Sequence, residues 1–146
     1  MMQDRKTIDE VEVLVSYIRQ KRKEFFVSKL SKIGIKTSSR GYILYTIYRD
    51  EGLVQDDISN TLSMDKAFVT RELNALSTMG LIYREKDTTD HRKNHIYLTD
   101  EGLEKGALVG EIIDRWNAKS FSDFSDSDID GFIDTLRHVK RNIDKW

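Results

Sequence analysis

Two short stretches of this sequence carry polar and basic side chains at spacings that suit contact with a nucleic acid. In the first, Asp90-His91-Arg92-Lys93, a carboxylate stands two residues before an arginine and a lysine follows directly. A guanidinium is flat and permanently charged, so it suits a narrow, electronegative groove, and a nearby carboxylate can hold it in one pose. Asp90 could also act as a turn-forming side chain, and the two roles can coexist.

The second stretch has helical periodicity. If Val69, Leu73 and Leu76 face a core, a row of polar and small side chains lies on the opposite face. Arginine can fork onto guanine or grip a phosphate, Thr and Asn can donate or accept, and Ala can touch a thymine methyl. The side chains expected on this outer face are Lys66, Ala67, Thr70, Arg71 and Asn74. Arg71 could instead pair with Glu72 or Asp65 on the surface.

Apolar periodicity and capping residues predict the elements that position these stretches. Gly34 is a plausible end for the first helix, Thr37-Ser38-Ser39 can cap the second, Ser63 or Asp65 can cap the fourth, and Ser125 can cap the last. The predicted order is a helix over 8–33, a helix from 37–39 to about 52, a short helix over 54–62, a helix over about 64–79, strands over 81–86 and 95–98 joined by a polar turn, and helices over 101–120 and 127–145.

Composition excludes several classes of protein. The chain has 146 residues and a net charge of −1, and it has no Cys, which excludes disulfides, Cys-based zinc sites and thiol redox sensing. No apolar run approaches the roughly 20 residues of a membrane helix, and the first residues lack the apolar core of a secretory signal. A cytoplasmic protein without membrane association is therefore expected.

No set of residues indicates catalysis or metal binding. The three histidines, His91, His95 and His138, are scattered. A nucleophile with its base, a glycine-rich phosphate loop and a pair of carboxylates on a cleft are all lacking. We therefore expect neither an enzyme nor a cofactor. Between Arg19 and Arg40 eight basic residues face only Glu24, and this stripe could meet phosphate or could be a solvated helix face.

The hairpin and the helix before it carry a family resemblance. The sequence reads Gly80-Leu81-Ile82-Tyr83-Arg84, then Asp90-His91-Arg92 at the tip, then Leu98-Thr99-Asp100-Glu101-Gly102, and Asp65-Lys66-Ala67-Phe68-Val69-Thr70-Arg71 precedes them. This ordered set resembles the MarR family of winged-helix regulators, and the helix order extends the resemblance over nearly the whole chain. Phe68 and Glu72 depart from the family pattern, which puts the target sequence in doubt but not the binding mode.

The resemblance implies a mainly α fold with a small β-hairpin wing. It implies a winged helix-turn-helix domain over 37–100, flanked by long dimerisation helices in 1–36 and 101–146. The helix over about 64–79 would lie in the major groove and the wing over about 82–98 in the minor groove, with Arg40 and Lys93 on the DNA backbone. A monomeric helical bundle with an inserted hairpin is the rival fold.

The function implied is a homodimeric, sequence-specific transcriptional regulator on a pseudo-palindromic DNA operator, a repressor released by a small aromatic or phenolic effector. The alternative is a winged-helix protein-interaction module that does not bind DNA. The residues expected at an effector site are Tyr17, Tyr42, Tyr45, Thr70 and Arg84. The tyrosines could equally be core, and Arg84 could tie the hairpin to its own domain. Gly102, Gly106 and Gly110 predict either a close approach of another helix or a bendable helix.

Overall fold

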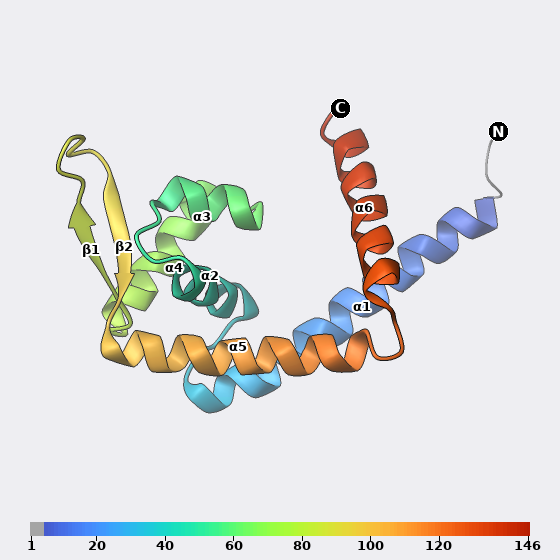
Figure 1. The fold of residues 1–146 in the computed structure, drawn as a ribbon, viewed down its shortest axis with the longest axis horizontal. Helices are drawn as coiled ribbons and strands as arrows, with labels where there is room; N and C mark the ends of the chain where they lie inside the picture. The colour runs from blue at the N-terminus through green and yellow to red at the C-terminus, as the bar shows by residue number, and fades with distance from the viewer. Residues whose placement is uncertain (1–4) are drawn as a thin grey trace. The chain divides into compact units, whose positions relative to one another are not determined.

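The computed structural model describes residues 5–146, and all of their side chains except those of residues 5, 6 and 8. Residues 1–4 of the predicted dimerisation region, and the Ile8 side chain of its apolar stripe, therefore lie outside the described residues. The elements are α1 (Arg5–Leu30), the 3-10 helix η1 (Ser31–Ile33), α2 (Ser38–Arg49), α3 (Gln55–Leu62), α4 (Lys66–Thr78), β1 (Ile82–Lys86), β2 (Asn94–Leu98), α5 (Asp100–Ser120) and α6 (Asp126–Ile143) (Figure 1). A mainly α fold with one antiparallel hairpin is thus confirmed.

Local capping chemistry explains where the helices begin and end. Gly34 ends η1 with a φ of 83°, a left-handed conformation that glycine adopts at little cost. The Thr37 side chain accepts from the Arg40 N–H at the start of α2, and the Asp65 side chain accepts from the Phe68 N–H at the start of α4. Of the two caps considered for α4, Ser63 instead ends α3 with a φ of 51°.

One hydrophobic core holds α2, α3, α4 and the hairpin together. The inner face predicted for α4 is confirmed, because Val69, Leu73 and Leu76 are fully buried. They share the core with apolar side chains from every neighbouring element, and burial of this kind is the main stabilising term in folding. Among the described residues, the other side chains that are at most 1% exposed are Phe26, Leu30, Ile35, Ile43, Leu44, Ile47, Ile58, Leu81, Ile96 and Val109.

The hairpin pairs in one register and is fastened to the core at its base. Ile82 lies opposite Leu98 and Lys86 opposite Asn94, so Asn94 belongs to β2 and not to the polar turn where it was expected. Leu53, in the link between α2 and α3, forms a bridge with Ile96. The open end of the wing therefore projects from a strand pair whose base is buried.

The three glycines of α5 mark a close approach within the chain, as one of the two predictions proposed. A side-chain carbon at Gly102 would lie 1.9 Å from the Leu81 carbonyl oxygen, which is sterically impossible. One at Gly106 would lie 2.9 Å from Tyr48, and one at Gly110 would lie 3.0 Å from Tyr45, both on α2. Small residues here let α5 pack directly on α2 and on the hairpin.

The structure divides into two compact units, one reaching to Ile113 and the other spanning Asp114–Trp146. In the first unit, α1 leaves apolar side chains such as Val11, Leu14 and Ile18 about half exposed. In the second, Phe121 and the apolar face of α6 line an open groove, and Phe132 and Leu136 are about half exposed. Among the described residues, none of the helices combines the length and apolar character that crossing a bilayer demands.

Candidate nucleic-acid interface

The outer face of α4 carries the side chains that its sequence predicted there. Lys66, Ala67, Arg71 and Asn74 are exposed, and Thr70 is half-buried. Lys66 forms an ion pair with Asp56 of α3 at 3.1 Å, with both side chains largely exposed. Exposed pairs of this kind contribute little to stability, so Lys66 stays available to a stronger anion.

Two of these polar groups already have partners inside the protein. The Thr70 hydroxyl donates to the Lys66 carbonyl at 2.8 Å and accepts from the Gln55 amide at 2.6 Å. The Asn74 side-chain oxygen accepts from the Arg84 guanidinium at 3.1 Å. Their contact with a base would therefore require an exchange of hydrogen bonds.

Arg71 is the arginine of this face, and its side chain is exposed. Its guanidinium lies 5.8 Å from the centre of the Phe68 ring, a cation–π contact on its own helix. The sequence offered two carboxylates, Asp65 and Glu72, as its partners. Within the described residues neither forms an ion pair with Arg71: Asp65 caps the helix and Glu72 pairs with Arg40. The surface-pairing alternative for Arg71 is thus wrong.

Arg40 has a different role from the one expected. Its Nε donates to Glu72 at 2.8 Å and its Nη2 donates to the other carboxylate oxygen at 3.4 Å. The two side chains are only 17% and 12% exposed, so this bidentate pair lies largely inside the protein and ties α2 to α4. This ion pair was not predicted from the sequence. Glu72 stands where an apolar residue is common in the family, and an acidic residue at such a position needs a partner. That departure was a usable signal for the pair.

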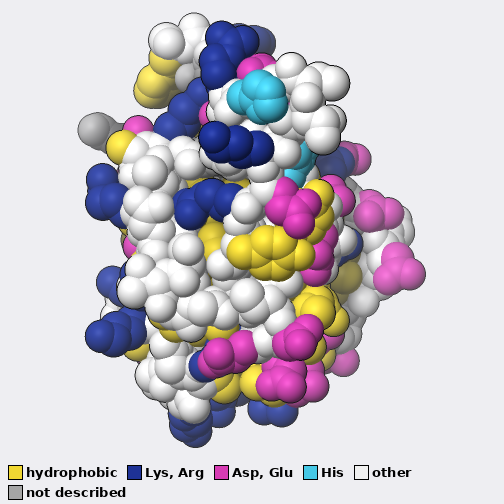
Figure 2. Space-filling view, turned by 90° about the vertical axis from the view of Figure 1, so that its left-hand side faces the viewer, with side chains coloured by type: hydrophobic (Ala, Val, Ile, Leu, Met, Phe, Trp, Pro, Cys, Tyr) yellow, Lys and Arg dark blue, Asp and Glu magenta, His cyan; other side chains and the backbone are white. Residues whose placement is uncertain are grey.

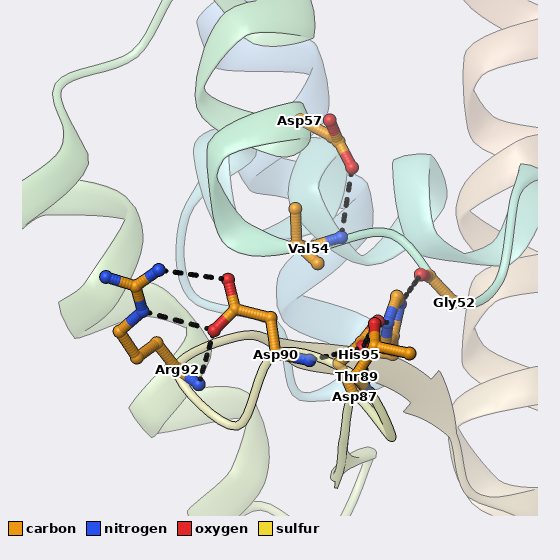
Figure 3. Close-up of polar contacts among 8 residues, drawn as sticks. All are labelled: Gly52, Val54, Asp57, Asp87, Thr89, Asp90, Arg92 and His95. Carbon is orange, nitrogen blue, oxygen red and sulfur yellow. Dashed lines mark hydrogen bonds and ion pairs between the residues drawn. The ribbon is translucent and has the colours of Figure 1, made fainter.

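The wing tip is a tight polar turn that presents one guanidinium. The Asp90 carboxylate accepts from the Arg92 backbone N–H and Nε, both at 3.1 Å, and from Nη2 at 3.4 Å (Figure 3). These bonds lower the pKa of Asp90, so it stays ionised near neutral pH. The Arg92 side chain is 91% exposed. Both predicted roles of Asp90, forming the turn and orienting Arg92, are present in one side chain.

A histidine that sequence reasoning left without a role connects this turn to the rest of the domain. His95 Nε2 lies 2.7 Å from Asp87 Oδ2, and His95 Nδ1 lies 2.6 Å from the Gly52 carbonyl oxygen (Figure 3). The bond to Asp87, and then the bond to Gly52, raise the pKa of His95 above its ordinary 6.5. Only the hairpin register brings Asp87 and His95 together, and register was not part of the prediction.

A shallow groove of about 260 Å³ lies between the start of α3 and the wing. Three cations line it, Arg84, Arg92 and Lys93, together with one anion, Asp56. Figure 2 shows this side of the molecule, with Lys and Arg side chains around the end of the hairpin at the top and acidic side chains gathered lower on the right. The positive charge of the wing is therefore local and is set by placement, since the chain as a whole has a net charge of −1.

The five residues predicted for an effector site do not line this groove together. Arg84 lines it, whereas Thr70 reaches it only through Gln55. Tyr42 is half-buried, with the Arg22 guanidinium 4.3 Å from its ring centre, Tyr45 packs on Tyr48, and Tyr17 is 60% exposed on α1. Within the described residues, no group of His, Asp and Glu is arranged to hold a metal ion.

Comparisons with known proteins agree with this geometry. The model of the MarR family matches residues 36–93, which include α2, α3, α4, β1 and the wing tip. The chain is 27% identical over 107 residues to the uncharacterized HTH-type transcriptional regulator YdgJ of Bacillus subtilis, covering 73% of this chain but 65% of YdgJ, slightly under two thirds of its length. It is 26% identical over 121 residues to the HTH-type transcriptional regulator BilQ of Clostridioides difficile, covering 83% and 82% of the two chains.

A solved protein–DNA complex has a similar fold. The S. aureus MepR–DNA complex superposes with a TM-score of 0.79 at 26% identity, covering 90% of this chain and 96% of MepR. The winged-helix architecture, and with it the arrangement of α3, α4 and the hairpin, is therefore that of a protein seen on DNA.

Proposed function

Since the chain belongs to the MarR family of DNA-binding transcriptional regulators, which are not enzymes, we propose that it is a homodimeric repressor that a small aromatic effector releases from a pseudo-palindromic operator. In this proposal residues 37–100 bind DNA and 1–36 with 101–146 form the dimer. As a DNA-binding regulator, the protein would act in the cytoplasm.

The observation that carries the DNA-binding mode is the pair of exposed guanidinium groups, one on each DNA-facing element. Arg71 on α4 reads base edges in the major groove, with Lys66, Ala67, Thr70 and Asn74 beside it. Arg92, held by Asp90, enters the minor groove, and Lys93 contacts phosphate. We leave Arg40 out of the contact set because Glu72 holds its guanidinium, and we assign it the positioning of α4.

A gel-shift experiment with DNA from upstream of the protein's own coding region tests this function. Wild type should form a discrete, competitor-resistant complex, and Arg71→Ala and Arg92→Ala should each weaken it. Ser77→Ala, an exposed change near the end of α4, is the matched control. If this DNA forms no complex and no duplex can be selected from a random pool, the interaction-module alternative is favoured instead.

Exposed apolar side chains support the dimer. Val11, Val15 and Ile18 recur at helical spacing on α1, and Phe132, Leu136 and Val139 do so on α6, all about half exposed. Apolar stripes of this extent mark interaction surfaces. Sedimentation at micromolar concentration should give a dimer, and removal of the residues after Phe121 should give an aggregating or unfolded product. A well-folded monomer of the intact chain would contradict the proposal.

The effector proposal now centres on Arg84. Its guanidinium lines the groove and also donates to Asn74, so it links the wing to α4. An anionic aromatic compound whose carboxylate pairs with Arg84 would compete with Asn74 and disturb the spacing of the two DNA-facing elements. Calorimetry with salicylate should show weaker binding to Arg84→Ala, whereas Lys86→Ala, a cation on the same strand outside the groove, should bind as wild type does. Equal affinity in all three would remove Arg84 from the site.

A further inference from the structure

Both ring nitrogens of His95 contact groups that can only accept a hydrogen bond. Nδ1 faces the Gly52 carbonyl oxygen at 2.6 Å and Nε2 faces the Asp87 carboxylate at 2.7 Å. A neutral imidazole has one N–H, so it would leave one of these short contacts without a proton. The doubly protonated imidazolium satisfies both. The geometry therefore selects the charged form of His95.

Asp87 connects His95 to the wing tip through hydrogen bonds. While Oδ2 accepts a hydrogen bond from His95 Nε2–H, Oδ1 accepts from the Thr89 N–H at 2.8 Å, the Thr89 hydroxyl at 2.7 Å and the Asp90 N–H at 2.9 Å (Figure 3). Asp90 in turn holds Arg92. A continuous chain of hydrogen bonds thus runs from the α2–α3 link through His95 to the guanidinium at the end of the wing.

The charged groups around the ring favour the protonated form on balance. Asp87 in the wing loop raises the pKa of His95, and Lys93 on the same loop lowers it by repulsion. Burial of the ring also lowers the pKa of His95. Glu85 on β1 lies opposite His95 in the hairpin register, and Asp50 and Glu51 lie in the link that supplies Gly52, but the rise in the pKa comes from the bonds to Asp87 and Gly52 and the charge of Asp87. Asp87 itself stays ionised, because the same bonds hold its pKa well below the ordinary 3.8.

We propose that protonated His95 is a positioning residue that orders the wing tip and thereby makes DNA binding stronger below neutral pH than above it. This inference rests on the proposed wing contact. Since the folded pKa lies above the ordinary 6.5, the stabilisation is complete below about pH 6.5 and is lost as the pH rises through the folded value. The phosphates of bound DNA would raise the pKa of His95 further, an effect of the same sign.

Fluorescence anisotropy with a labelled duplex, selected from a random pool by the wild-type chain, tests the proposal at constant ionic strength. The wild-type dissociation constant should rise between about pH 6 and pH 8.5, by at most about tenfold for each unit by which the pKa of His95 in the DNA-bound protein exceeds its pKa in the free protein. His95→Gln, which cannot titrate, should bind with a flat profile. His91→Gln, an exposed histidine at the tip of the same wing, is the matched control and should keep the wild-type profile. A wild-type profile in His95→Gln, or a flat one in wild type, would overturn the proposal.

Asp87→Asn provides a second route that does not alter the histidine. The asparagine oxygen can still accept from Thr89 and Asp90, and its amide can donate to a neutral His95, so the wing should stay ordered without a proton on Nε2. This variant should bind with a flat profile across the same range. A wild-type pH profile in Asp87→Asn would also contradict the proposal. This variant therefore keeps the test decisive if His95→Gln does not fold.

Two further readouts separate this proposal from the one on which it rests. Two-bond nitrogen–proton spectra of the free protein should show both His95 nitrogens protonated at about pH 6, and a neutral tautomer there would contradict the inference. If Arg92→Ala binds as tightly as wild type, the wing contact itself fails. If Arg92→Ala weakens binding while His95→Gln keeps the wild-type pH profile, only the histidine relay fails.

Discussion

The recognition helix α4 and the wing tip both face the proposed DNA site, but different forces hold them in place. α4 rests on Val69, Leu73 and Leu76, which are fully buried, and on a bidentate pair with Arg40 that is largely inside the protein. The wing tip has no apolar anchor beyond its base and is ordered by hydrogen bonds among exposed or half-exposed side chains. Hydrophobic burial is insensitive to pH, whereas a polar network that contains a histidine is not.

This contrast assigns different work to the two elements. An element fixed by packing can present a rigid set of side chains to base edges, where misplacement by a fraction of an ångström loses a hydrogen bond. An element fixed by a short polar relay can be ordered or released by one proton. Changes in the core should therefore act on stability, and changes at the wing on affinity and on its dependence on pH and salt.

Leu73→Ala should have the largest effect on the packed side of the comparison. Leu73 is fully buried, and loss of such a side chain costs about 2–5 kcal/mol in the free energy of unfolding because it leaves a cavity. Urea unfolding measures this loss, with Ser77→Ala on the same helix as the control. A loss below about 1 kcal/mol would show that α4 is not anchored by its apolar face.

Glu72→Gln should have the next largest effect on stability, because it leaves the largely buried Arg40 guanidinium without its carboxylate. We expect a loss of about 1–3 kcal/mol in the free energy of unfolding, and weaker DNA binding because α4 loses its tie to α2. The double variant Arg40→Met with Glu72→Leu should recover most of the stability, since an apolar pair can replace a buried ion pair. If the double variant is less stable than Glu72→Gln, the pair is not acting as a packed unit.

Arg71→Ala should leave stability unchanged and should weaken operator binding. Within the described residues its guanidinium lies over the Phe68 ring and joins no ion pair, so its loss removes little from the fold. One lost base contact costs about 1–3 kcal/mol per half-site, and a dimer loses it twice. Anisotropy titration and urea unfolding of the same samples check both parts. If Arg71→Ala lost as much free energy of unfolding as of DNA binding, Arg71 would be a residue that stabilises the fold and not one that contacts DNA.

Arg92→Ala should have the smallest effect of the four on affinity and should change the salt dependence most. A phosphate or minor-groove contact supplies affinity that falls with ionic strength, so we expect a loss of roughly three- to tenfold and a shallower salt slope. Lys86→Ala, which removes an exposed cation from β1 outside the groove, is the matched control for charge alone. An unchanged salt slope in Arg92→Ala would contradict a DNA contact at the wing tip.

Sequence predicted best what local chemistry determines. The caps at Thr37, Asp65 and Ser125 are confirmed because each acts within about one turn of its own helix, and the buried face of α4 follows from the spacing of its apolar residues. The turn around Asp90 and Arg92 was predictable for the same reason, since its bonds span two residues.

Sequence failed where a contact depends on how separate elements pack. Arg40 and Glu72 are 32 residues apart, and no local pattern pairs them. Asp87 and His95 meet only because the hairpin adopts one register, and Gly52 reaches the same ring from the α2–α3 link. Aromatic tyrosines together with the cationic Arg84 suggested one effector site. They lie on separate elements, however, and none of the three tyrosines lines the groove that contains Arg84.

The central claim is that α4 reads bases while the wing supplies affinity through groove shape and charge. Its most direct test is the binding of wild type, Arg71→Ala and Arg92→Ala to a panel of single-base operator variants at fixed salt and pH. Arg71→Ala should lose its preference at one base pair in each half-site and keep it elsewhere. Arg92→Ala should bind every major-groove variant more weakly by a similar factor, most of all where the flanks are A·T-rich. Wild-type affinity of Arg92→Ala for the whole panel, or full discrimination by Arg71→Ala, would contradict the account.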